Sequence, residues 1–318
     1  MKHLIVLNQK AGAEKQVEEF KKQVEEEFKG LDFEVYLTTG PRSVIPFLKE
    51  YLAKTKDTVR VYACGGDGTV HEVVNGIAEA KNAELAVMAL GTGNDFVKIY
   101  AKTDSWDEIV KNKAGENRFK SFKNLINGNV EEIDLSKVTG ENMEEPWYSI
   151  NVVNFGFDAI VGVKGNENKL KGKKNPYGPA AIIPAILGGR FNKIIVKADG
   201  EQLNKKKMLL ASLAQGQWVG GQYHASPKSD NKDGLIDVVV LNCMSLATLM
   251  GKYFGPYEKG QHLDSEKLMK KIVYRRAKVV EMESKKPFDI CVDGEIIKRK
   301  YFKVECLHKA LKFVVPND

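Results

Sequence analysis

Short apolar runs alternate with amphipathic helical patterns along the first part of the chain, up to residue 90. Because strands that alternate with helices form a parallel sheet covered on both faces, this pattern predicts an α/β domain. Ligands of such sheets bind beyond the carboxyl ends of the strands, where we expect a binding site. The expected strands are 4–7, 33–37, 59–63 and 85–90, and the expected helices are 13–28, 43–53 and 69–80.

Glycines follow each of the four expected strands, at Gly12, Gly40, 65–68 and 91–93, so they should converge on that edge of the sheet. In residues 63–72, Ala-Cys-Gly-Gly-Asp-Gly-Thr-Val-His-Glu, three glycines within four positions allow a tight turn and a close approach to a ligand. The N-terminus of the following helix offers unpaired N–H groups that attract anions. Together these features predict a phosphate site.

Two kinds of side chain in this segment refine the prediction. Thr69 and Glu72 have the Thr-x-x-Glu spacing of a capping box, which predicts that the helix begins at Thr69. Asp67 does not suit a bare anion site, but it suits a ribose hydroxyl or a Mg²⁺ ion that arrives with a nucleotide. An ordinary glycine-rich turn without a ligand has the same pattern, and the sequence alone leaves that alternative open.

The pattern changes past residue 125, where short β-rich runs replace the alternation. Asp199-Gly200 and Asp293-Gly294 stand between apolar runs and predict hairpin turns. We therefore expect an α/β + β fold: an α/β domain with a parallel sheet at 1–125, then a mostly antiparallel β-sandwich at 126–318, with a C-terminal segment that could pack back on the first domain. The expected strands of the second domain are 147–153, 193–198, 208–213, 236–241, 278–282, 288–292 and 302–306, with helices near 180–187 and 246–253.

Length, charge and cysteine content narrow the class of protein. At 318 residues the chain is long enough for two domains, and its formal net charge of +7 favours phosphate-bearing ligands or an anionic membrane surface. Four cysteines scattered singly argue for a reducing compartment and against a zinc site or a disulfide framework. No apolar run reaches the roughly 18–20 residues that span a bilayer, and the N-terminus begins with an expected strand rather than a signal peptide. We expect a soluble, cytoplasmic protein that is peripheral at the membrane surface and has no nucleic acid partner; whether it forms a homodimer is open.

Two motifs follow one another at neighbouring strand ends, Gly65-Gly66-Asp67-Gly68-Thr69 and Ala89-Leu90-Gly91-Thr92-Gly93-Asn94-Asp95-Phe96. The pair resembles the signature of the diacylglycerol kinase catalytic family, which includes bacterial lipid kinases. Segments 151–159, 220–238 and 292–295 resemble, in this order, the β domain of that family. The resemblance implies a nucleotide-binding α/β domain, a β-sandwich, and ATP- and Mg²⁺-dependent phosphorylation of a lipid hydroxyl.

The resemblance also implies roles for individual residues. Asp67 would organise the nucleotide and its Mg²⁺, and Glu295 would be the general base for the lipid hydroxyl. A second Asp-Gly-Glu, which ends at Glu201, is expected to lie on the surface. The other nucleotide contacts would be Asn8, Gly12, Thr38 (or Thr39 beside it), Gly66, Gly68, Thr69, Glu72 and Thr92. A Mg²⁺ ion in the β domain would bind Asp230, Asp233 and the carbonyl oxygen of Leu235, although this segment reads equally as a solvated turn.

The first loop departs from the family, because Asn8-Gln9-Lys10-Ala11-Gly12 stands where Asn-Pro-x-Ser-Gly is usual. Ala11 lacks the hydroxyl, and Lys10 offers only a charge in its place. An inactive nucleotide or lipid sensor would explain this change, and an NAD kinase shares the first glycine motif, so both remain as alternatives. The lipid itself is not identified: diacylglycerol, a sphingoid base, phosphatidylglycerol and undecaprenol all present a hydroxyl.

The basic segment 164–174 leads into the apolar, proline-bounded stretch 177–187. A basic segment beside a short apolar one is what attachment to an anionic membrane surface needs. The alternative is a mobile basic loop next to a core helix.

Overall fold

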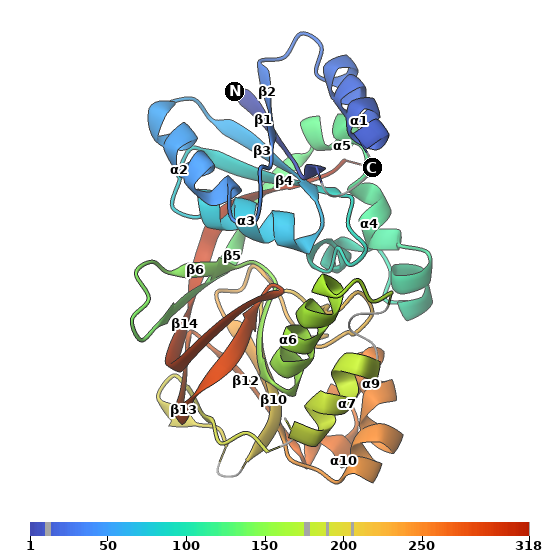
Figure 1. Ribbon diagram of the computed structural model, residues 1–318, viewed down its shortest axis with the longest axis vertical. Coiled ribbons are helices and arrows are strands. Elements are labelled where there is room, and N and C mark those ends of the chain that lie inside the picture. Colours follow the sequence, from blue (N-terminus) through green and yellow to red (C-terminus); the bar gives the residue numbers. More distant parts are fainter. Residues whose placement is uncertain (10–13, 175–178, 189–190, 205–206, 318) are drawn as a thin grey trace. The chain divides into compact units, whose positions relative to one another are not determined.

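The computed structural model describes residues 1–317 except 10–13, 175–178, 189–190 and 205–206 (Figure 1). The chain forms two compact units, Met1–Asp134 together with Lys309–Asp318, and Leu135–His308. Parallel strands build the sheet of the first unit and antiparallel strands build that of the second, which confirms the predicted fold class.

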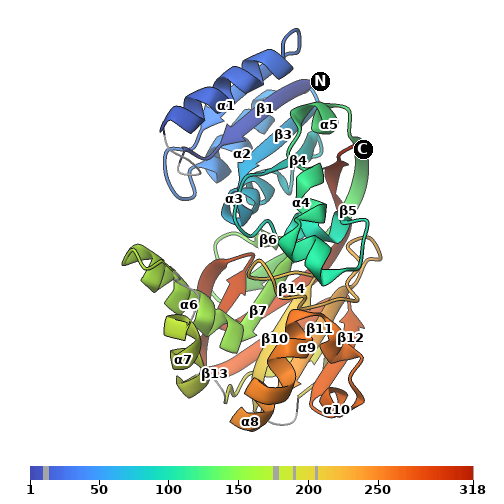
Figure 2. The same ribbon diagram turned by 90° about the vertical axis from the view of Figure 1, so that its right-hand side faces the viewer.

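The first unit alternates strands and helices in chain order: β1 (Lys2–Leu7), α1 (Glu14–Glu27), β2 (Phe33–Leu37), α2 (Val44–Lys54), β3 (Val59–Gly65), α3 (Asp67–Ile77) and β4 (Ala83–Ala89), then η2 (Phe96–Tyr100), η3 (Asp107–Lys111), α4 (Ala114–Arg118) and α5 (Phe122–Ile126). The parallel sheet has the order β4-β3-β1-β2. Every residue of β3 and β4 is buried, as strands covered on both faces require. Figures 1 and 2 show α1 and α5 on one side of this sheet and α2 and α3 on the other.

The last strand of the chain, β14 (Glu295–Val315), ends in the first unit. Phe313 pairs with Leu85 of β4, and its ring centroid lies 5.2 Å from that of Phe96 and 5.1 Å from that of Tyr100. Because Phe313 is fully buried, the final residues supply part of the core of the first unit.

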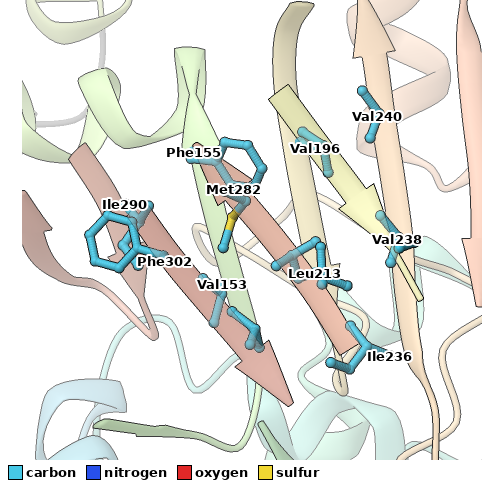
Figure 3. Packing of buried hydrophobic residues seen from close by; sticks show 14 of the residues in the cluster. Val153, Phe155, Val196, Leu213, Ile236, Val238, Val240, Met282, Ile290 and Phe302 are labelled. Atoms are coloured by element: carbon cyan, nitrogen blue, oxygen red, sulfur yellow. The ribbon is translucent and has the colours of Figure 1, made fainter. Parts of the chain in front are cut away.

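The second unit contains the antiparallel strands β6 (Trp147–Ser149), β7 (Val152–Gly156), β8 (Ile195–Ala198), β9 (Glu201–Gln202), β10 (Met208–Ala214), β11 (Ile236–Asn242), β12 (Ile272–Ala277), β13 (Val279–Val292) and most of β14, while β5 (Asn129–Gly140) begins in the first unit. The main order is β12-β11-β10-β7-β13-β14. β13 pairs with β8 in its first half and with β7 at its end, with a register shift between Glu283 and Phe288. Fully buried apolar side chains of these strands form one core, including Phe155, Leu213 and Met282 (Figure 3).

Short helices enclose a second core in this unit: α6 (Phe157–Leu170), α7 (Pro179–Gly188), α8 (Leu246–Thr248), η4 (Leu249–Tyr253), α9 (Phe254–Glu258), η5 (Gln261–Leu263) and α10 (Glu266–Met269). Leu210 of β10 and Leu241 of β11 are buried in it together with the stacked rings of Tyr253 and Tyr257. The helices therefore cover the sheet face that carries Leu210 and Leu241.

Several observed elements differ from the predicted ones. Residues 147–153 form two strands, β6 and β7, rather than one, and residues 279–292 form the single strand β13 rather than two. The strands β5 and β12 and the helix α6 were not predicted, and β14 extends beyond the predicted strand 302–306 at both ends. Both Asp-Gly hairpins are confirmed, because Asp199, Gly200, Asp293 and Gly294 all have the positive φ that such turns require.

Candidate functional site

Two glycine-rich loops lie against each other at the carboxyl ends of β3 and β4. The amide of Leu90 donates to the carbonyl of Gly65 over 3.0 Å. A Cβ atom on Gly91 would stand 2.4 Å from Cα of Gly66, and one on Gly93 would stand 2.5 Å from Oδ2 of Asp67. None of these glycines has a positive φ, so they are needed for the contact between the loops rather than for a turn conformation.

The fit between the loops can be tested without any ligand. We expect Gly91→Ala to lower the free energy of unfolding by roughly 1–3 kcal/mol, because its methyl group would meet backbone rather than a flexible side chain. Gly68→Ala is the matched control, since no atom lies within 4 Å of the Cβ position there. Urea unfolding of the two purified variants checks this, and equal losses would show that the loops do not need close contact.

The side chain of Asp67, in the first loop, joins the two loops by hydrogen bonds. Its Oδ2 accepts a hydrogen bond from the amide of Asn94 at 2.9 Å, and its Oδ1 accepts one from the amide of Asp95 at 2.7 Å. Asn94 has a φ of 50° and closes the second loop on itself, with its side chain bonded to both the amide and the carbonyl of Gly91. The same side chain donates to the buried carboxylate of Glu116 at 2.9 Å.

Lys98 is a further member of this cluster that the sequence reasoning missed. It is only 2% exposed, and its Nζ donates to Oδ1 of Asp95 at 2.8 Å and to the carbonyl of Gly93 at 2.7 Å. The three-residue spacing from Asp95 to Lys98 was the available signal. Lys98 thus neutralises Asp95, one of the two neighbouring carboxylates, and its bond to Gly93 stabilises the second loop.

The surroundings of Asp67 disfavour its negative charge. Burial, and then the charge of Asp95, raise the pKa of Asp67 to about 7, against the opposing effects of Lys98 and the two amides. In the free protein this carboxyl therefore keeps its proton at pH values at which an ordinary aspartate is ionised. A bound cation would replace that proton.

The helix α3 starts at Asp67, two residues earlier than the capping box predicts, and that capping box is not formed. Thr69 instead accepts a hydrogen bond from Nδ2 of Asn8 at 3.1 Å. The carboxylate of Glu72 accepts from the amides of Arg42 at 2.9 Å and Val44 at 3.3 Å, so it secures the beginning of α2. At the start of α3 the amides of Thr69 and Val70 donate to the carbonyl of Gly66 at 2.9 and 3.1 Å, and the residue before them, Gly68, is exposed.

The other predicted nucleotide contacts follow the ends of β1, β2 and β4. Asn8 comes directly after β1, and Thr38 comes directly after β2, where its amide donates to the carbonyl of Leu7 at 3.0 Å. Thr92 is exposed in the loop after β4. Gly12 lies outside the described residues. The carboxyl edge of the sheet thus gathers those predicted contacts that the structure describes.

In the second unit, the hairpin that carries Glu295 is fixed by Asp293. This carboxylate accepts from Oγ of Ser149 at 2.6 Å and from the amides of Ile150 and Val152, each at 2.9 Å, and so holds the break between β6 and β7. Glu295 itself is exposed. Asp293 therefore positions the turn, and the carboxylate of Glu295 is left for solvent or substrate.

The twin hairpin at 199–201 has nearly the same local geometry. Asp199 accepts from the amides of Lys278 and Val279, and Glu201 is exposed like Glu295. The surroundings of the two hairpins differ, because helix α6 packs against the one that carries Glu295. A Cβ atom on Gly162 of α6 would lie 3.4 Å from the side chain of Ile296, the residue after Glu295. Turn geometry alone therefore does not distinguish the two glutamates.

The turn 230–235 holds the oxygen groups that were predicted to bind a β-domain metal ion. Oδ1 of Asp230 accepts from the amide of Lys232 at 3.0 Å, and Oδ1 of Asp233 accepts from the amide of Leu235 at 2.9 Å. The guanidinium of Arg276 forms an ion pair with Oδ2 of Asp233. A metal ion that needs several free oxygens fits this arrangement poorly.

The basic segment 164–174 divides between helix and turn. Nζ of Lys164, in α6, lies 3.1 Å from the carboxylate of Glu167, whereas Lys171, Lys173 and Lys174 are exposed after the helix ends. Residues 175–178, which include the first two residues of the apolar stretch 177–187, lie outside the described residues. In the part of the chain that the structure describes, no helix is both long and apolar enough to cross a bilayer.

Comparisons with known proteins cover both units. Residues 2–141 match the family model described as diacylglycerol kinase catalytic domain, and residues 151–315 match that described as YegS C-terminal NAD kinase beta sandwich-like domain. A Bacillus subtilis protein named diacylglycerol kinase is 27% identical over 271 residues, which are 84% of this chain and 80% of that protein. A probable lipid kinase YegS-like of Alcanivorax borkumensis is 26% identical over 264 residues, 81% of this chain and 79% of that protein. The crystal structure of a putative diacylglycerol kinase from Bacillus anthracis shares the fold, with a TM-score of 0.68 and 22% sequence identity. The match covers 99% of this chain and 97% of that chain.

Proposed function

The chain belongs to the diacylglycerol kinase catalytic family of lipid kinases, and from that premise we propose that it transfers the γ-phosphoryl group of ATP to the hydroxyl of a membrane lipid, with Mg²⁺. The first unit binds the nucleotide, and the second unit binds the lipid and supplies the base. The protein acts as a peripheral enzyme at the cytoplasmic surface of the membrane.

The placement of Asp67 at the beginning of α3 is the observation that carries this proposal. The N-terminus of a helix attracts phosphate, whereas a carboxylate beside it repels phosphate. A divalent cation would resolve this conflict: Asp67 would hold it, and its charge would offset that of the phosphates. Asp67, held by the amides of Asn94 and Asp95, thus suits Mg·ATP better than a bare anion.

Other residues of the first unit complete the nucleotide site. Gly68 leaves the helix N-terminus open to the phosphates, and Thr69 and Asn8, already bonded to each other, present polar groups beside it. Thr38 and Thr92 contribute from the neighbouring strand ends, and Gly12 from the first loop. Glu72 contributes indirectly, by securing the beginning of α2.

Glu295 provides the proton acceptor of the reaction. The lipid hydroxyl oxygen forms a bond to the γ-phosphorus while the bond from that phosphorus to the bridging oxygen breaks, so ADP leaves. The hydroxyl proton passes to the carboxylate of Glu295. Bound Mg²⁺ would neutralise the charge on the phosphate oxygens during the transfer.

Incubation of the purified protein with radiolabelled ATP, Mg²⁺ and single lipids in mixed micelles tests the proposal. Diacylglycerol, a sphingoid base, phosphatidylglycerol and undecaprenol are the candidates, and NAD is the control for a soluble acceptor. We expect label in one lipid and none in NAD. Label in NAD alone, or hydrolysis of ATP without any labelled product, would contradict it.

Exposed lysines after α6 suit the contact with the membrane. We expect the replacement of Lys171, Lys173 and Lys174 by Gln to weaken binding to anionic vesicles, because each near-surface lysine contributes about 1 kcal/mol there. Activity on lipid in those vesicles should fall as well, while activity on a soluble short-chain analogue should remain. Vesicle sedimentation measures the effect.

A triple variant with the same loss of charge is the control. Lys29, Lys56 and Lys81 are also exposed but belong to the first unit. If both triple variants lose vesicle binding to the same degree, net charge rather than this segment attracts the membrane.

A further inference from the structure

The turn 230–235 is closed by contacts within the protein. Asp230 and Asp233 each bind an amide two residues further along the chain, as short polar side chains do in turns. Gly234, with a φ of 78°, allows the chain to reverse before β11. One oxygen of each carboxylate is therefore already engaged with the turn itself.

Arg276 reaches this turn from β12. It stands opposite Asp237 of β11 in the register of the two strands, and its guanidinium forms the ion pair with Oδ2 of Asp233. The side chain of Asp233 is 19% exposed and that of Arg276 is 43% exposed, so water only partly screens the pair. Arg276 thus places a positive charge beside Asp233, whose other oxygen, Oδ1, is already bonded within the turn.

Asp237 adds to the negative charge of this region. It is fully buried at the start of β11, and its Oδ1 accepts a hydrogen bond from the hydroxyl of Tyr274. Three carboxyl groups, of Asp230, Asp233 and Asp237, therefore lie in or next to the turn, and among the ion pairs described here a guanidinium contacts one of them. A guanidinium cannot lose its charge near neutral pH, and its planar fork suits a carboxylate.

We propose that Arg276 takes the place of a metal ion at this turn, so that the turn is stable without Mg²⁺. A Mg²⁺ ion requires near-octahedral coordination by oxygen, and it would have to displace the guanidinium from Asp233 and tolerate its charge. The family resemblance implies a metal at Asp230, Asp233 and Leu235, and this chain carries its own cation there instead.

Hydrogen–deuterium exchange of peptides covering 230–240 tests the proposal, because the readout is local and needs neither ATP nor lipid. In the wild-type protein, exchange should be the same in EDTA and in millimolar Mg²⁺. In Arg276→Gln, exchange in EDTA should be roughly two- to fivefold faster, the range for a part-exposed ion pair. Mg²⁺ should slow it, because the freed carboxylate can then take a metal ion.

Arg275→Gln is the matched control. This neighbouring arginine of β12 is exposed and bonds only to the carbonyl of Tyr274 among the contacts described, so its exchange should equal that of the wild type. In Asp233→Asn, exchange in EDTA should be faster than in the wild type, as in Arg276→Gln, but Mg²⁺ should not slow it. Slower exchange of the wild type in Mg²⁺, or unchanged exchange in Arg276→Gln, would overturn the proposal.

Discussion

Asp67→Ala is expected to lower kcat/KM for ATP by roughly 10³-fold or more. Phosphoryl transfer depends on neutralisation of the phosphate charge, and the variant lacks the carboxylate that would hold the neutralising cation. The substitution also removes two hydrogen bonds between the glycine loops, so we expect a loss of about 1–3 kcal/mol in the free energy of unfolding. Steady-state kinetics and urea unfolding of the purified variant measure the two effects. Near-normal turnover would contradict the role given to Asp67.

Asn94→Gly separates the two contributions of Asp67. Glycine tolerates the positive φ at this position, but it removes the bonds that hold Gly91 and Glu116 while the carboxylate of Asp67 remains. We expect a comparable loss of stability with a much smaller loss of activity. If both variants lose activity equally, Asp67 acts only by joining the loops.

The pH dependence of the wild type gives an independent check on Asp67. Since burial, with the charge of Asp95, raises its pKa to about 7, the carboxyl of the free protein becomes mostly protonated as the pH falls below that value. A cation binds the ionised form, so the affinity for Mg·ATP should fall by about tenfold for each pH unit below 7. Isothermal titration with ATP in buffers of different ionisation enthalpy would detect the released proton.

Glu295→Gln is expected to lower kcat by roughly 10²-fold or more while the KM for ATP changes little, as the loss of a general base implies. The amide keeps the size of the side chain but cannot accept the proton. Because Glu295 is exposed, the stability of the protein should not change.

Glu201→Gln is a control that the chain itself supplies. Both glutamates follow an Asp-Gly turn with positive φ, both are exposed, and in both turns the aspartate binds amides of another segment. We expect Glu201→Gln to be as active as the wild type. Equal effects of the two substitutions would show that the base lies elsewhere.

The course of the backbone could be predicted wherever the local sequence decides it. Alternation of apolar runs and helical patterns gave the parallel strands, and Asp-Gly pairs gave both hairpins. The helix α6 escaped prediction because Gly162 and Gly165 interrupt it and its apolar residues do not form one stripe. Only residues 302–306 of the long strand β14 were predicted, because charged residues such as Lys298 and Lys300 obscure the alternation in its first part.

The partners of side chains could not be predicted, because they depend on segments far apart in the sequence. Glu72 has the spacing that would cap its own helix, yet it binds the beginning of α2. The motif glycines suggested close approach to a ligand, but Gly66 and Gly91 first of all permit contact between two loops. Lys98 becomes visible as a site residue only once its contacts with Gly93 and Asp95 are known.

The return of β14 to the first unit has a consequence for biosynthesis. A ribosome delivers residues 1–134 first, but their core lacks Phe313 until nearly all of the remaining chain has been translated. The second unit, residues 135–308, is continuous and can close as soon as it has left the exit tunnel. The first unit is therefore the last to be completed, although its first residues emerge first, and until then its sheet lacks the contact with the end of β14.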